Sequence, residues 1–330
     1  MTKKILVLGS NSFAGSNFID YCLFKRCKIY AISRSSENNA FLKYKKNPYL
    51  KNLSFFKKDV NSSKDRNFIL GIIKKNHISH IINFAAQGMV EESWFSPEDW
   101  YKTNFTSQIL LINQIIKLKI IKKYINFSTP EVYGSTKKFF KESYSFNPST
   151  PYALSRASFD LHLKLLNKNY NFPMIITRTA NIYGPYQQLY RIIPKSIISF
   201  LKKKKINLHG GGNSIRSFIF MNDVSDALYK ILLRGKIGDT YHISTNRFVS
   251  IKDLVIKIQK KLNKSKLINL KSNERIGKDF AYKLNSLKLR KKMKWKPKTS
   301  LDDGINETID WVKLNFNYFK KLNLEYKHKK

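Results

Sequence analysis

Four side chains between Thr129 and Arg156 form a set that could move protons. Thr129 and Glu131 follow a short apolar run, and Tyr152 and Arg156 come later, four residues apart. Residues at i and i+4 are neighbours on one face of a helix, so the guanidinium of Arg156 would lie beside the phenol of Tyr152. A nearby cation favours the phenolate. We therefore expect Tyr152 to act as a base at a pH nearer to neutral than free tyrosine.

A glycine-punctuated turn near the amino terminus gives this set a context. The apolar run 4–8 leads into Gly9, Ser12 and Gly15, and a helix-like pattern follows. A strand, a turn and a helix in this order are what a dinucleotide-binding fingerprint requires. Serine replaces the usual middle glycine, but Gly9 and Gly15 still allow the tight turn and close helix packing, and backbone amides at the helix start can bind pyrophosphate. An ordinary strand-to-helix turn is the alternative.

Short apolar runs alternate with amphipathic stretches up to about residue 180, and the pattern then loosens. The alternation predicts an α/β protein with a Rossmann-type, doubly wound parallel sheet covered by helices on both faces. We assign residues 1–180 to an NAD(P)-binding domain. Residues 181–330 are assigned mainly to a smaller α/β substrate-binding lobe, with some segments returning to the first domain. The expected strands are 5–8, 29–32, 53–56, 80–84, 124–128 and 174–177, and the expected helices are 13–24, 65–75, 97–118 and 153–167.

With these motifs in order, the chain resembles the extended short-chain dehydrogenase/reductases, and among them the nucleotide-sugar 4,6-dehydratases that act on GDP-mannose or dTDP-glucose. The resemblance runs from Lys3 to about Val312. Besides the glycine turn and Tyr152-Ala-Leu-Ser-Arg156, it rests on the segments Asp59-Val60, Asn83 to Ala86, Thr103-Asn104, Ser128 to Gly134, Arg178 to Pro185 and Arg216 to Asp223.

The resemblance implies NAD(P) as the cofactor. The second expected strand ends in Ser33-Arg34-Ser35, without the acid that would bind a ribose 2′-hydroxyl, and an arginine there can instead contact a 2′-phosphate. We therefore favour NADP over NAD, with an ordinary exposed Arg34 as the alternative. The residues assigned to the cofactor are Gly9, Ser12, Phe13, Gly15, Arg34, Asp59, Val60, Ala85, Ala86, Asn104, Tyr152 and Arg156.

The resemblance also implies a reaction. Tyr152 would take the proton of the sugar 4-hydroxyl as a hydride moves from C4 to the nicotinamide, and Thr129 would hydrogen-bond the 4-oxygen. Glu131 would then remove the C5 proton, water would leave C6, and the hydride would return to C6. Two positions depart from the family pattern. Pro130 stands where dTDP-glucose dehydratases have an acidic aspartate, and Arg156 stands where the family has lysine, whose point-like ammonium a planar guanidinium cannot copy.

The resemblance implies a nucleotide-diphosphate sugar as the substrate, and arginine is suited to the bidentate phosphate contacts that such a substrate offers. A 4-epimerase uses the same tyrosine and cofactor but needs no base at C5, so Glu131 favours a dehydratase. A nucleotide-glucuronate decarboxylase and a non-catalytic Rossmann-fold scaffold remain alternatives. The residues assigned to substrate binding are Gln87, Thr129, Asn181, Arg191, Arg216 and Arg275.

The composition sets further expectations. With 62 Lys and Arg against 22 Asp and Glu, the formal charge is +40, but the lysines are scattered along the sequence. We interpret them as a solvated surface, and expect neither nucleic-acid binding nor membrane insertion. The two cysteines are too few for a disulfide framework and fit a cytoplasmic protein, and the histidines show no metal-ligand spacing. The resemblance implies a homodimer formed through the helices 97–118 and 153–167, and surplus apolar residues in 97–118 favour it.

Overall fold

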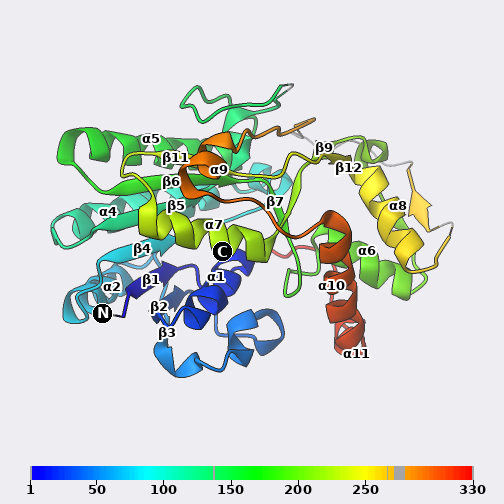
Figure 1. The fold of residues 1–330 in the computed structure, drawn as a ribbon, viewed down its shortest axis with the longest axis horizontal. Helices are drawn as coiled ribbons and strands as arrows, with labels where there is room; N and C mark the ends of the chain where they lie inside the picture. Colours follow the sequence, from blue (N-terminus) through cyan, green and yellow to red (C-terminus); the bar gives the residue numbers. More distant parts are fainter. Residues whose placement is uncertain (1, 137, 266, 271–278, 329–330) are drawn as a thin grey trace.

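A seven-stranded parallel sheet organises the larger part of the molecule (Figure 1). The computed structural model describes residues 2–136, 138–265, 267–270 and 279–328. The strand order is β3-β2-β1-β4-β5-β6-β11, so all six expected strands and the Rossmann arrangement are confirmed. The strands are β1 (Lys4–Leu8), β2 (Lys28–Ser33), β3 (Leu53–Lys57), β4 (His80–Asn83), β5 (Lys123–Ser128), β6 (Met174–Thr179) and β11 (Thr240–Ile243).

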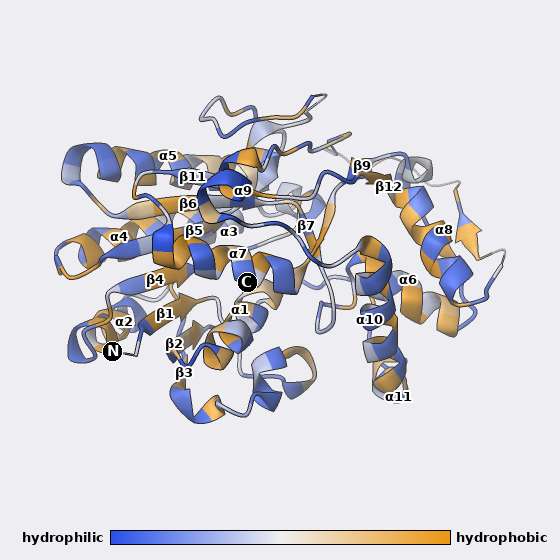
Figure 2. Cartoon of the chain, viewed as in Figure 1, coloured by the Kyte–Doolittle hydropathy of each residue, from blue (hydrophilic) through white to orange (hydrophobic). Residues whose placement is uncertain are grey.

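Helices cover both faces of this sheet, because its strands carry apolar side chains on both sides. Ile5 and Val7 of β1 belong to one buried cluster, and Leu6 and Leu8 belong to the other. The strands are mostly apolar, whereas the outer helices mix apolar and polar residues (Figure 2). One face is covered by α1 (Phe13–Phe24), α7 (Met221–Arg234) and α9 (Leu287–Met293), and the other by α2 (Ser63–Lys75), α4 (Ser107–Ile116) and α5 (Pro151–Tyr170). The short helix α3 (Pro97–Tyr101) packs against α5.

The helix expected over 97–118 is interrupted. A short π-helical stretch, Lys102–Thr106, separates α3 from α4. It buries Thr103 and Asn104 below the site described in the next section. The other expected helices match the structure within a few residues, and α1 has the expected bounds.

The smaller lobe has its own apolar core and lies beside the carboxyl ends of the strands (Figure 1). Its helices are α6 (Ile192–Leu201), α8 (Ile251–Lys261), α10 (Leu301–Leu314) and α11 (Phe316–Phe319). Short strands pair as β7 (Asn181–Tyr183) with β10 (Phe218–Phe220), β9 (Ile215–Arg216) with β12 (Val249–Ser250), and β8 (Ile206–Asn207) with β13 (Ile268–Asn269). Between these segments the chain returns to the large sheet, where β11 pairs with β6 and α7 packs on α1.

Asp223 ties the lobe to the Rossmann part. It lies in the first turn of α7, and its carboxylate accepts hydrogen bonds from the backbone N–H groups of Lys298 (2.9 Å) and Thr299 (3.0 Å). The indole of Trp295 donates to the Asp223 carbonyl (3.2 Å). These bonds fix the segment that leads into α10 against the start of α7.

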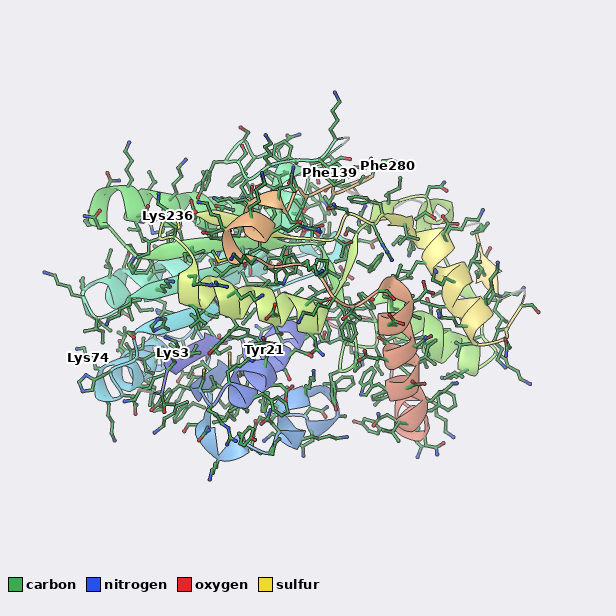
Figure 3. The ribbon with its side chains drawn as sticks, in the orientation of Figure 1. Lys3, Tyr21, Lys74, Phe139, Lys236 and Phe280 are labelled. Atoms are coloured by element: carbon green, nitrogen blue, oxygen red, sulfur yellow. The ribbon has the colours of Figure 1, made fainter. Side chains whose placement is uncertain are left out.

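The basic side chains are spread over the surface. The exposed Lys3 precedes β1, Lys74 lies on α2 and Lys236 follows α7 (Figure 3). None of the helices in the described part of the chain combines the length and hydropathy needed to cross a bilayer.

Candidate active site

One large cavity, of about 790 Å³, lies between the sheet and the lobe. Its floor is built by residues that directly follow β1, β4, β5 and β6, namely Gly9, Phe84, Thr129 and Ala180. The strand order reverses between β1 and β4, and this is where open α/β sheets bind ligands. The cavity is also lined by Glu131, Tyr152 and Arg156, so the structure brings the four proton-handling residues into one site.

The turn after β1 requires both of its predicted glycines. Gly9 has φ +74°, and a Cβ there would lie 2.6 Å from the amide nitrogen of Ala85. A Cβ on Gly15 would lie 2.4 Å from the carbonyl oxygen of Gly9. Ser12 is the N-cap of α1, and its hydroxyl accepts from the Gly15 N–H (3.0 Å). Serine therefore serves as a helix cap where the usual motif has glycine, and Gly15 packs beneath the turn.

The loop after β4 is held from below and from the side. Asn104 accepts from the Gln87 N–H (2.6 Å), and its amide donates to the Gln87 carbonyl and to the Ser155 hydroxyl (3.0 Å each). Asn104 thus fixes the loop to α5 and does not itself line the cavity. On the cavity side, Arg34 donates to the Gln87 side-chain oxygen (2.8 Å).

Thr129 and Glu131 are placed together by the turn that ends β5. The 3₁₀ turn Pro130–Tyr133 follows Thr129, whose hydroxyl donates to a carboxylate oxygen of Glu131. Burial raises the pKa of Glu131, and the charge of Asp279 adds to this effect, while Arg216 and Arg191 oppose it. A carboxylate with a raised pKa is a stronger base than a free glutamate, as proton abstraction from carbon requires.

Tyr152 lies in the first turn of α5, which begins after the N-cap Thr150. Burial and the charge of Glu131 raise the pKa of Tyr152, although Arg156 and a hydrogen bond with Thr129 lower it. The expectation that Arg156 brings this pKa toward neutral is therefore wrong for the protein side chains alone. Burial and a neighbouring carboxylate outweigh a single cation in this cleft.

Arg156 is almost completely buried, with 2% of its surface exposed. One terminal nitrogen donates to the Phe127 carbonyl, whereas Nε has no hydrogen-bond partner among the described residues. An unpaired buried donor of a charged group is costly unless a ligand satisfies it. Together with the glycine turn, this wall of the cavity fits a dinucleotide, with Arg156 facing it.

Most residues assigned to the cofactor and substrate line the cavity. Those that do are Gly9, Ser12, Phe13, Arg34, Asp59, Val60, Ala85, Ala86, Gln87, Thr129, Asn181, Arg191 and Arg216, in addition to the residues above. Arg275 lies outside the described residues. Gly15 and Asn104 lie below the cavity and support it.

Arg216 is oriented mainly by backbone groups. Its terminal nitrogens donate to the carbonyls of Phe280 (2.9 Å) and Asp279 (2.8 Å), and its guanidinium lies 4.4 Å from the ring centre of Tyr282. The cation is therefore fixed at the cavity wall near Glu131, whose pKa it lowers.

Sequence reasoning missed Asp279 and Tyr282, a hydrogen-bonded carboxylate and phenol at this wall of the cavity. The Tyr282 hydroxyl donates to Asp279 (2.7 Å), and both residues line the cavity. Burial and the charge of Glu131 raise the pKa of Tyr282. The available signal was their position in the sequence, because Asp279 and Tyr282 closely follow Arg275, which was assigned to substrate binding. Other lining residues that were missed are Tyr190, Tyr326 and Lys327.

Comparisons with known proteins agree with this geometry. The family model described as GDP-mannose 4,6 dehydratase matches residues 6–308. Human dTDP-D-glucose 4,6-dehydratase is 30% identical over 327 residues, which cover 97% of this chain and 93% of the human protein.

Solved structures give the same result. A dTDP-glucose 4,6-dehydratase from Bacillus anthracis in complex with NAD is 29% identical, with a TM-score of 0.85, and the match covers 96% of this chain and 98% of that one. A dTDP-glucose 4,6-dehydratase from Streptomyces venezuelae, with NAD and TYD bound, shares the fold with a TM-score of 0.88 at 24% identity, over 96% and 98% of the two chains.

Proposed function

Since the chain belongs to the GDP-mannose 4,6-dehydratase family and is a nucleotide-sugar 4,6-dehydratase that uses NAD(P), we propose how its residues share the reaction. The observation that carries the proposal is the meeting of Thr129, Glu131 and Tyr152 at one wall of the cavity. The product is a 4-keto-6-deoxy sugar. When bound, NAD(P) accepts the hydride from C4 and returns it to C6.

Tyr152 and Thr129 act on the sugar 4-oxygen. Tyr152 accepts the proton of the 4-hydroxyl, and the Thr129 hydroxyl donates a hydrogen bond to the forming carbonyl oxygen. Arg156 stabilises the phenolate because its charge lowers the pKa of Tyr152. The 4-ketone then acidifies the C5 hydrogen.

Glu131 and Tyr282 divide the loss of water. Glu131 removes the C5 proton and returns it to C5 after the hydride reaches C6. Pro130 cannot donate a proton to the departing C6 hydroxyl, so we assign that step to Tyr282, which shares a hydrogen bond with Asp279 near Glu131. The proton that Tyr152 took from the 4-hydroxyl replaces the one lost from Tyr282, through solvent, and the net change is the loss of one water.

The base at C5 is what separates this reaction from epimerisation. An epimerase needs no such carboxylate, whereas Glu131 lines the cavity together with Tyr152 and accepts a hydrogen bond from Thr129. Mass spectrometry of products from a panel of nucleotide hexoses tests the assignment. A product lighter by one water supports it, and an isomer of unchanged mass contradicts it.

The cofactor is assigned here as NAD(P), with NAD preferred. The sequence favoured NADP because of Arg34, but Arg34 donates to Gln87, and the two solved relatives contain NAD. Titration of the protein with NAD and NADP separates the two, and tighter binding of NADP would restore the original expectation.

The substrate is a nucleotide-diphosphate hexose, and the observations favour no single nucleotide base. The relatives are named for dTDP-glucose, whereas Pro130 removes the acid that the resemblance associates with that substrate. The panel experiment identifies the base. We also propose a cytoplasmic location, because the two cysteines are free and buried and do not form a disulfide.

We propose a homodimer formed through α4 and α5. Leu110 on α4 is 46% exposed, and Leu161 and Leu165 on α5 are 42% and 56% exposed. Apolar side chains left on neighbouring helices are typical of a symmetric interface.

A further inference from the structure

The chain that follows α11 runs from the lobe back to the Rossmann part, where His328 contacts Asp99 and Trp100. Residues 321–328 alternate between exposed and half-buried, as in an extended chain with one side against the protein. The inward residues are Leu322, Leu324, Tyr326 and His328. The first two pack against the lobe core.

The end of this segment contacts the Rossmann part. The Gln87 amide donates to the Tyr326 hydroxyl (2.7 Å) and lies 3.0 Å from Nδ1 of His328. Nε2 of His328 lies 2.6 Å from the Asp99 carboxylate, and its ring stacks on Trp100, with centroids 4.8 Å apart and an interplanar angle of 12°.

The same segment is fastened to the lobe. Glu325 pairs with Lys195 of α6 (2.7 Å), and the rings of Tyr326 and Tyr190 meet edge to face, 5.3 Å apart. Leu322 and Leu324 add apolar contacts with the lobe core. The segment therefore bridges both parts of the molecule across the cleft.

The bridge lies on the cofactor half of the cavity. Tyr326 and Lys327 line the cavity, and the partner of Tyr326 is Gln87, which also binds Arg34. Arg34 follows β2, where a Rossmann site binds the adenosine ribose. Gln87 lies in the loop after β4, whose Ala85 lies against Gly9 of the glycine turn.

We propose that residues 324–328 are part of the nucleotide-binding site and retain the cofactor by closing over it. Tyr326 is the residue that faces the dinucleotide, with Gln87 orienting its hydroxyl, and Lys327 adds a cation for the phosphates. His328 on Trp100 and Asp99 anchors the end of the segment. The inference rests on the proposed function, because a cofactor that is restored in each turnover does not need to dissociate.

Cofactor binding without substrate tests this proposal. The variant pair Tyr326→Ser with His328→Ala removes both Rossmann contacts, and a chain ending at Leu324 removes the bridge. Lys321→Ala, an exposed residue of the same segment, is the matched control. We expect dissociation constants and dissociation rates for NAD or NADP to rise about tenfold or more in the double variant and the truncation, because two hydrogen-bonded anchors are lost. The control should match the parent protein.

Three results would overturn the proposal. Unchanged cofactor affinity would show that the segment does not bind the cofactor, and tighter affinity would show that it competes for the site. Weaker binding of a nucleoside diphosphate alone, with unchanged cofactor affinity, would assign the segment to the substrate. Circular dichroism melting of the double variant separates these outcomes from misfolding. The readout does not require turnover, so it stands apart from a failure of the dehydratase assignment.

Discussion

Asp160 and Arg178 form an ion pair of 2.8 Å, with both side chains fully buried directly beneath the loop of the candidate active site. Asp160 lies on α5, the helix of Tyr152, and also accepts from the Ser128 hydroxyl (2.7 Å). Arg178 of β6 donates to the Tyr133 hydroxyl (2.6 Å). Ser128 and Tyr133 flank Thr129 and Glu131, so the pair holds both ends of the loop relative to the helix that carries the phenol.

Removing the carboxylate of Asp160 should destabilise the protein strongly. Asp160→Ala leaves the buried charge of Arg178 uncompensated, and loss of one partner of a buried pair costs about 3–5 kcal/mol. Guanidinium denaturation measures the free energy of unfolding. Asp302→Asn is the control, because Asp302 pairs with Lys257 and Lys261 but is 52% exposed, and exposed pairs contribute about 1 kcal/mol or less. Equal losses for the two variants would contradict the role given to Asp160.

Glu131→Gln should stop dehydration and leave the fold intact. Loss of a general base slows a reaction by about 10²–10⁴-fold. Because the pKa of Glu131 is raised in the folded state, its ionised form costs stability at neutral pH. This loss of stability is absent below the pKa of Glu131 in the unfolded state. It develops as the pH rises from that value to the higher pKa of Glu131 in the folded state. The variant should therefore be at least as stable as the parent near pH 7, and this advantage should shrink as the pH falls.

The rate of the parent enzyme should reflect the same pKa. Its acid limb should lie above the pH at which an ordinary glutamate titrates, because Glu131 must be ionised to remove the C5 proton. A limb at the ordinary glutamate pKa, or a Glu131→Gln variant that still releases water at the parent rate, would exclude Glu131 as the base.

Arg156→Ala should slow oxidation at C4 more than it weakens sugar binding. Arg156 lowers the pKa of Tyr152 against a larger upward effect of burial, so its removal raises that pKa further. The rate of the alanine variant should recover in part as the pH increases and Tyr152 ionises unaided. Arg156→Lys should retain substantial activity because the charge remains. Pre-steady-state absorbance of the nicotinamide measures this step, and equal rates for alanine variant and parent at every pH would reject the assignment.

Local patterns were enough to predict the elements that carry the site. The apolar runs gave six strands, and the helix after the glycine turn has the expected bounds, with Ser12 as its N-cap. Thr129 and Tyr152 meet because β5 and α5 are adjacent in a Rossmann arrangement, which strand and helix alternation already implies.

Features that depend on distant segments were not predictable. Alternation of charge and apolar residues does not reveal that Tyr326 reaches Gln87, which is 239 positions away. The pKa of Tyr152 is raised by burial and by the charge of Glu131, and the four-residue spacing of Tyr152 and Arg156 reveals neither effect. The direction of Arg34 toward Gln87 likewise depends on how the loops after β2 and β4 pack together.

Charged substitutions on α5 should dissociate the proposed homodimer. Leu161 and Leu165 are one helical turn apart and exposed, so Leu161→Lys with Leu165→Lys would place like charges at a symmetric interface. Sedimentation velocity should then give a monomer at micromolar concentration. Leu314→Lys is the control, since Leu314 is 79% exposed and lies on α10, a helix of the smaller lobe that Figure 1 shows away from α5. A parent protein that sediments as a monomer would remove the dimer.

Tyr282→Phe should slow the loss of water and spare the steps before it. The phenylalanine keeps the ring under Arg216 but cannot donate to the departing C6 hydroxyl, and loss of a general acid lowers turnover by about 10²-fold or more. In deuterated water, the variant should still exchange the C5 hydrogen of its substrate, because Glu131 acts first, whereas Glu131→Gln should not. Tyr144→Phe is the control, since Tyr144 bonds Thr240 and does not line the cavity. If Tyr282→Phe turned over at the parent rate, another group would have to donate the proton to the C6 hydroxyl. If this variant no longer exchanged the C5 hydrogen, Tyr282 would act in a step before the loss of water.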